Sequence, residues 1–102
     1  MQKPALILSL ALPVLMMAPQ ASANVIETAC RQLDTASATA ARCRCVGEVA
    51  TQSLTKSDQR KVATWFKDPH QAQVVRQSDK RRDEKLWARY KAFGDAAARS
   101  CG

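Results

Sequence analysis

The chain is poor in the side chains that most enzymes and nucleic-acid-binding proteins use. Of its 102 residues only 5% are aromatic and one is histidine, so groups for base stacking and for general acid and base catalysis are scarce. It contains no GxSxG motif and no glycine-rich phosphate loop. With 3 glycines and 4 prolines, it is neither collagen-like nor a low-complexity linker. These absences predict a folded protein without enzymatic activity and without a cofactor.

The first 23 residues predict a cleaved signal peptide. One positive charge precedes a mostly apolar run, residues 5–18, which closes on the small-x-small sequence Ala21-Ser22-Ala23. A retained membrane anchor fits less well, because a spanning helix needs roughly 20 apolar residues and Pro13 and Pro19 interrupt this run. We expect cleavage after Ala23 to leave one soluble domain, residues 24–102, in the periplasm or outside the cell.

The predicted exported domain is basic. It carries 15 Lys and Arg against 9 Asp and Glu, a net charge of +6. Such a surface suits an anionic partner, which in the cell envelope means a phospholipid headgroup, a cell-wall glycan or an acidic protein. We do not expect nucleic acid, because an exported protein does not meet it.

All four cysteines lie in this domain, at Cys30, Cys43, Cys45 and Cys101. An even number of cysteines in a short exported chain is typical of a disulfide framework. Loops of about 14 and 57 residues closed by such bridges would stabilise the fold by roughly 3 and 4 kcal/mol. A domain this small obtains only a few kcal/mol from its core, so we expect it to depend on its disulfides.

The spacing of Cys43 and Cys45 leaves two pairings open. A bridge between these two would close too tight a ring within a helix. The remaining pairings are Cys30 with Cys43 and Cys45 with Cys101, or Cys30 with Cys45 and Cys43 with Cys101. In both pairings the two bridges extend from opposite flanks of the second helix, because Cys43 and Cys45 lie on opposite sides of its apolar stripe. The second helix should therefore lie between the first helix and the last.

Cys43-Arg44-Cys45 also permits an alternative function, thiol redox chemistry or soft-metal handling. Zinc and thioredoxin-like sites use CxxC spacings and haem attachment uses CxxCH. Because none of these motifs occurs, we expect no metal site.

Apolar residues follow a helical period nearly everywhere, which predicts an all-α fold of four or five short helices in a compact bundle. The first helix should bury Ile26 and Cys30. The second, from about Thr39 to Leu54, carries a stripe with Gly47 beside it, where the glycine either permits close helix approach or faces solvent. The stripe residues are Val46, Val49, Ala50 and Leu54.

Three further segments continue the helical pattern. Thr55 to Asp58 resembles an N-cap segment for a third helix. Asp68-Pro69 should end that helix and cap a fourth running to about Ser78, with Gln71 reaching back as the N3 partner. Ser78-Asp79 either caps a fifth helix or is passed through. The last helix buries a clear stripe, formed by Leu86, Tyr90, Phe93, Ala97 and Cys101.

The candidate binding surface is a basic face of the last helix, roughly opposite this stripe. It consists of Arg81, Arg82, Lys85 and Arg89, with Arg76 and Lys80 nearby in sequence. Asp79, Asp83 and Glu84 share the segment and can pair with these cations at helical spacing. The face is therefore either a docking surface for an anionic partner or an ordinary solvated helix surface.

The remaining candidates fit structural roles better. Trp65, Trp87 and Tyr90 occur at helical spacing, which is more typical of a core than of a ligand box. His70 follows Pro69 at a predicted helix start and has no neighbouring acid or nucleophile, so it is interpreted as a surface residue.

Residues 54–93 resemble a group of small exported proteobacterial proteins without an established activity, some of which carry the label "arginine transporter". The resemblance rests on Leu54 to Arg60, Phe66 to His70, Val75 to Asp79 and Trp87 to Phe93, and includes the CxC and the terminal Cys. It implies an accessory role in amino-acid uptake, because the predicted domain has no span for a permease and is too small for a two-lobed binding protein. Our first expectation is a non-enzymatic binding protein for an anionic envelope component.

Overall fold

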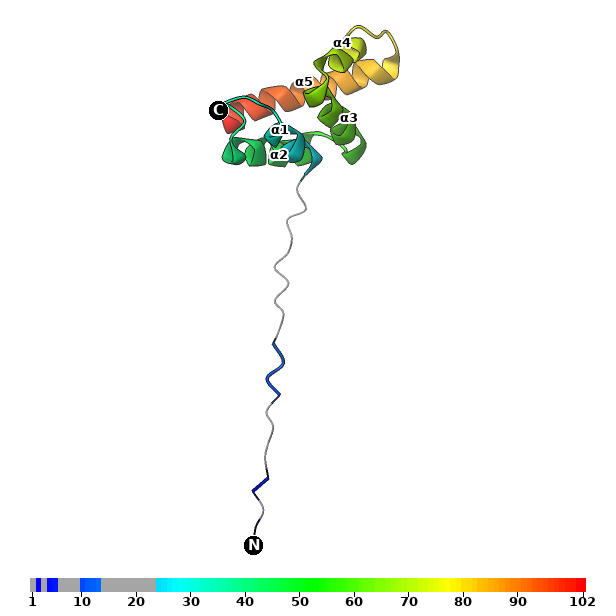
Figure 1. Cartoon of the computed structure of the whole chain (residues 1–102). Coiled ribbons are helices and arrows are strands. Elements are labelled where there is room, and N and C mark those ends of the chain that lie inside the picture. The colour runs from blue at the N-terminus through cyan, green and yellow to red at the C-terminus, as the bar shows by residue number, and fades with distance from the viewer. Residues whose placement is uncertain (1, 3, 6–9, 14–23) are drawn as a thin grey trace.

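The computed structural model describes residues 2, 4–5, 10–13 and 24–102 (Figure 1). Most of the predicted signal peptide, including its cleavage site after Ala23, lies outside these residues. The described chain is all-helical, without a strand, as the sequence predicted. Its five helices are α1 (Val25–Arg31), α2 (Ala40–Ser53), α3 (Lys56–Lys67), α4 (Pro69–Arg76) and α5 (Arg81–Cys101).

Side-chain caps fix the starts of the first four helices. Asn24 accepts from the backbone of Ile26 at 2.7 Å, and Thr39 and Thr55 accept from the third residue after them. These oxygens satisfy N–H groups that have no partner within the helix. The predicted bounds of α2 and the predicted start of α3 are confirmed.

The α3–α4 junction departs in one detail from the predicted capping box. Asp68 caps α4 by accepting from the backbone N–H of His70 at 3.2 Å. Gln71 does reach back, but its side-chain amide donates to the Asp68 carboxylate at 3.2 Å, whereas in a capping box its oxygen would accept from the Asp68 backbone N–H. The Asp68 N–H is already committed to the Thr64 carbonyl of α3, so the helix before the junction has taken the group that a capping box would use.

The helical conformation is interrupted between α4 and α5, so residues 69–101 do not form one continuous helix. The Ser78 hydroxyl accepts from the Lys80 N–H at 3.2 Å and donates to the Asp83 carboxylate at 2.7 Å. Lys80 occupies the N-cap position of α5 without a side-chain cap of its own. Ser78 therefore organises this turn from two residues before the N-cap.

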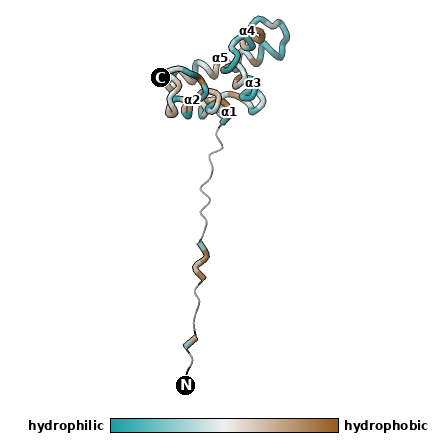
Figure 2. Tube along the Cα trace, viewed as in Figure 1, coloured by the Kyte–Doolittle hydropathy of each residue, from teal (hydrophilic) through white to brown (hydrophobic). Residues whose placement is uncertain are grey.

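All helices contribute to a shared apolar core. Trp65 of α3, Ala72 of α4 and Phe93 of α5 are buried in this core. Figure 2 shows hydrophobic residues distributed along the helices and a hydrophilic connection between α4 and α5. The buried members are Ile26, Val49, Ala50, Leu54, Val62, Trp65, Ala72, Leu86 and Phe93.

α2 contacts α1 on one side and α5 on the other, whereas α4 packs on α3 and the first half of α5 (Figure 1). The predicted position of α2 between the first and last helices is confirmed. The described chain is more extended than the compact bundle expected from the sequence. The described residues 2, 4–5 and 10–13 lie away from the helices (Figure 1), whereas α5, the longest helix with 21 residues, spans only about 30 Å at 1.5 Å per residue.

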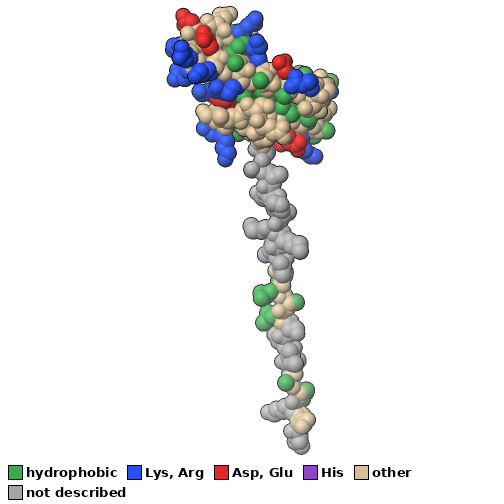
Figure 3. Space-filling view, turned by 180° about the vertical axis from the view of Figure 1, so that it is seen from behind, with side chains coloured by type: hydrophobic (Ala, Val, Ile, Leu, Met, Phe, Trp, Pro, Cys, Tyr) green, Lys and Arg blue, Asp and Glu red, His purple; other side chains and the backbone are tan. Residues whose placement is uncertain are grey.

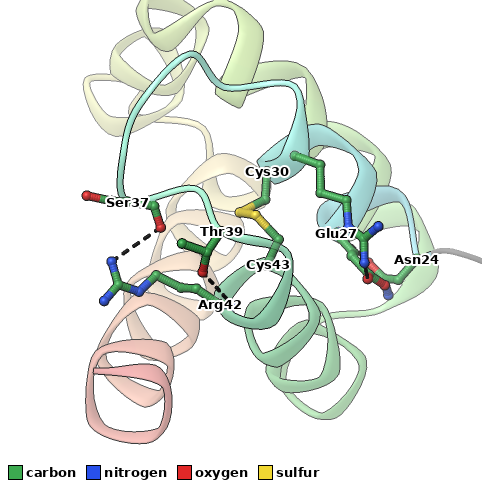
Figure 4. Close-up of a disulfide and its surroundings, with 8 residues drawn as sticks. Asn24, Glu27, Cys30, Ser37, Thr39, Arg42 and Cys43 are labelled. Carbon is green, nitrogen blue, oxygen red and sulfur yellow. Dashed lines mark hydrogen bonds and ion pairs between the residues drawn. A yellow bond between two sulfur atoms is a disulfide. The ribbon is translucent and has the colours of Figure 1, made fainter.

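Two disulfides join α2 to its neighbours. Cys30 pairs with Cys43, and Cys45 pairs with Cys101, with Cα–Cα distances of 5.4 and 5.8 Å. Figure 4 shows the first bridge between α1 and α2, beneath a loop that Arg42 also holds by donating to the Ser37 carbonyl. The first of the two predicted pairings is thus the one present.

Gly47 permits the close approach of α1 and α2. It is buried, and a Cβ built on it would lie 2.9 Å from the Cβ of Glu27 in α1. Of the two interpretations of this glycine, close helix approach is the correct one.

Candidate anionic-partner face

The basic residues gather at one end of the molecule. Arg81, Arg82 and Lys85 lie exposed in the first turns of α5, close to Arg76 at the end of α4 and to Lys80 in the connecting turn. Figure 3 shows Lys and Arg side chains crowded over this end, with some acidic side chains among them. The chain therefore brings together five of the six cations named from the sequence.

These five cations are not neutralised by ion pairs. Within the part of the chain that the structure describes, the only Lys or Arg nitrogens within 4.0 Å of a carboxylate belong to Arg31 and Arg89. Asp83 instead accepts the Ser78 hydroxyl. The expected pairing within the 79–85 segment is not formed, so its cations remain available to an external anion.

Arg89 differs from the other candidates because it is part of the fold. Its Nε and one Nη donate to the two carboxylate oxygens of Asp58 in α3, at 2.7 and 3.0 Å. Asp58 is only 4% exposed, while the Arg89 side chain is 44% exposed. Such two-point pairing fixes the guanidinium plane, so Arg89 ties α5 to α3 and contributes less free charge to the face than the sequence suggested.

The electrostatics of this pair follow from its geometry. The Arg89 hydrogen bonds lower the pKa of Asp58 below its usual value, against the opposing effect of burial, and the charge of Arg89 and hydrogen bonds from Thr55 lower it further. The same pairing raises the pKa of Arg89. Both groups are therefore charged at neutral pH.

The four cations of the predicted basic face lie at different angles from the apolar stripe of α5. Arg89 is four residues before Phe93, about 40° away around the helix at 100° per residue, and Arg82 stands in the same relation to Leu86. Phe93 and Leu86 are buried. Arg82 and Arg89 therefore border the seam where α5 packs on α3 and α4. Arg81 and Lys85 lie about 140° and 100° around the helix from Leu86, so the placement roughly opposite the stripe describes these two residues and not Arg82 and Arg89.

The aromatic residues are part of the core, as expected. Trp65 is 6% exposed and meets Tyr90 edge-to-face with ring centroids 5.0 Å apart. Trp87 lies 5.2 Å from Tyr90. This packing locks α3 against α5, and a small pocket of about 170 Å³ lies beside the three rings.

Sequence reasoning missed a groove next to the basic face. It lies between α3, α4 and the start of α5, encloses about 500 Å³, and is walled by Trp65, Val74, Val75 and Leu86. Val74 is 57% exposed, more than any other large apolar side chain in the helices. The sequence does not distinguish Val74 from the other apolar residues of the fourth helix, so nothing in it points to this groove.

The cysteines and the histidine form no further site in the described residues. Every cysteine is disulfide-bonded, and no cluster of three potential metal ligands occurs in that part of the chain. His70 is exposed at the start of α4. Among the same residues, no helix is both long and apolar enough to cross a bilayer.

Comparison with known proteins adds no relative. No family model matches the chain, and neither the curated proteins nor the solved structures gave a significant match. The functional interpretation therefore rests on the residues of this chain.

Proposed function

We propose that the protein is a small exported, non-enzymatic binding protein that docks an anionic envelope component through the basic face at the α4–α5 end. One observation carries this proposal: Arg81, Arg82 and Lys85 project from one end of α5, with Arg76 and Lys80 beside them, and none has a carboxylate partner in the described residues. Unpaired like charges held close together create a positive potential that attracts and orients an anion.

Arg89 supports the docking face without being its main contact. Its pairing with Asp58 holds α5 against α3, which fixes the direction in which the first turns of α5 present their cations. A test of binding must therefore leave Arg89 intact, because its loss would disturb the fold.

The test compares two charge-matched triple variants. R81E/R82E/K85E should lose retention on anionic phospholipid vesicles or on cell-wall glycans, whereas R44E/K91E/R99E, which reverses three exposed cations elsewhere, should retain most of it. Both variants change the net charge equally, so a difference between them reports the location of the charge. Equal retention by the two variants on every anionic surface tested would refute the docking face.

We also propose export with cleavage after Ala23, which makes residues 24–102 the mature domain. Two observations support this. The first described helix is capped by Asn24, whose amide also donates to Gln59 of α3 at 2.7 Å, so the residue that follows the predicted cleavage site is itself an integral part of the fold. The two disulfides are typical of an oxidising compartment. Mass spectrometry of protein from the cell envelope should show Asn24 as the first residue, and an intact leader would contradict export with cleavage.

A further inference from the structure

The groove beside the basic face combines an apolar interior with unpaired cations. Trp65 and Leu86, which are nearly buried, form its floor, and the exposed Val74 stands at its edge. Lys61 and Arg82 also line it, and neither has a carboxylate within 4.0 Å in the described chain. The third charged lining residue, Asp83, accepts the Ser78 hydroxyl through one carboxylate oxygen and keeps its negative charge, so the lining carries two cations and one anion.

We propose that this groove binds a single-chain anionic amphiphile, such as a fatty-acid carboxylate, with its head between Lys61 and Arg82 and its chain along Val74, Val75 and the floor. This inference rests on the proposed function, because Arg82 belongs to both the basic face and the groove. The volume of about 500 Å³ falls within the range of small-molecule sites, which are mostly apolar with a few polar groups that orient the ligand.

The shape and lining favour this occupant over the other anionic components considered above. A glycan offers no apolar chain to cover Val74 and Val75. A bilayer surface is flat and its chains lie below the headgroups, whereas the apolar surface here lines a groove together with Lys61 and Arg82. An amphiphile removes the valines from water and places its charge where the unpaired cations are.

The molecule provides its own control groove. A second groove of about 440 Å³ lies between α1, α3 and α4, and its exposed apolar residue is Val25, which is 43% exposed. Its one cation is Lys67, which is followed directly by Asp68 in the lining. The two grooves are alike in size and apolar lining but differ in cationic character, so charge complementarity predicts binding in the first alone.

Calorimetry with dodecanoate below its micelle concentration tests the proposal on the oxidised protein. We expect saturable binding of one molecule, no comparable binding of acetate, which has charge without a chain, and none of dodecyl maltoside, which has a chain without charge. V74E and R82Q should each weaken dodecanoate binding about tenfold or more. V25E in the control groove and K91Q on the far half of α5 should bind like the parent protein. Circular dichroism and melting curves check that all variants are folded.

Several outcomes would overturn the proposal. Absence of dodecanoate binding, equal binding by V74E and the parent protein, or a greater loss in V25E than in V74E would each do so. If the parent protein does not bind dodecanoate but V74E loses retention on vesicles, the groove would be assigned to a bilayer lipid instead. These results are distinct from failure of the proposed function, which is read from the two charge-reversal variants on vesicles and glycans.

Discussion

Asp58 in α3 and Arg89 in α5, 31 residues apart in sequence, form a two-point ion pair at 2.7 and 3.0 Å. The carboxylate is almost completely buried and the guanidinium is half exposed. The pair is therefore asymmetric. Removing Arg89 leaves a buried charge without a partner, while removing Asp58 leaves a guanidinium that water can solvate.

We expect R89A to lower the free energy of unfolding by about 2 kcal/mol at pH 7, less than for a fully buried pair because Arg89 is partly solvated. Since the folded-state pKa of Asp58 is lowered, its contribution is present above its unfolded pKa of about 3.9 and is lost as pH falls through the lower folded value. The deficit of R89A should therefore shrink between pH 5 and pH 3. Urea titrations at several pH values measure it.

R99A is the matched control for R89A, because Arg99 is exposed on the same helix and is not ion-paired. It should change stability by no more than about 0.5 kcal/mol. A deficit in R89A that is the same at pH 3 and pH 7 would show that Arg89 acts through packing of its stem and not through its charge.

Two glycines in helices should respond to alanine in opposite directions. At Gly47 a Cβ would lie 2.9 Å from the Cβ of Glu27, whereas at Gly94 nothing lies within 4 Å. Alanine gains about 1 kcal/mol of helix propensity at either site, but overpacking at Gly47 costs about 1–3 kcal/mol. G94A should therefore raise the midpoint of thermal unfolding and G47A should lower it. A rise in both midpoints would mean that α1 can move away from α2 at little cost.

Local signals predicted most of the helix boundaries. Thr55 and Asp68 are recognisable as caps because a cap and the helix it begins are adjacent in sequence, and the start of the second helix near Thr39 follows from the start of its apolar pattern. The apolar stripes of α2 and α5 could also be predicted from the sequence, since each stripe depends on the residue spacing within one helix.

Relationships between distant segments were not predicted. The flanks of Cys43 and Cys45 could be assigned, but not which flank faces α1, so two disulfide pairings stayed open. Asp58 gave no sign that it would engage Arg89, because Asp58 also suits a helix start. The groove needs three helices at a defined spacing, which no single segment of the sequence encodes.

The dependence of the fold on its two disulfides is the last prediction. Replacing Cys30 and Cys43 by alanine should cost roughly 3 kcal/mol, and replacing Cys45 and Cys101 roughly 4 kcal/mol, because the second bridge closes the longer loop in the unfolded chain. Together these losses rival the total stability of about 5–15 kcal/mol typical of a domain. The variant in which all four cysteines are replaced by alanine should thus be largely unfolded when measured by circular dichroism. Reductant should shift the urea midpoint of the parent protein strongly downward. Thiol counting should find no free thiol before reduction and four afterwards. An unchanged midpoint in reductant would show that the helical core holds without its bridges.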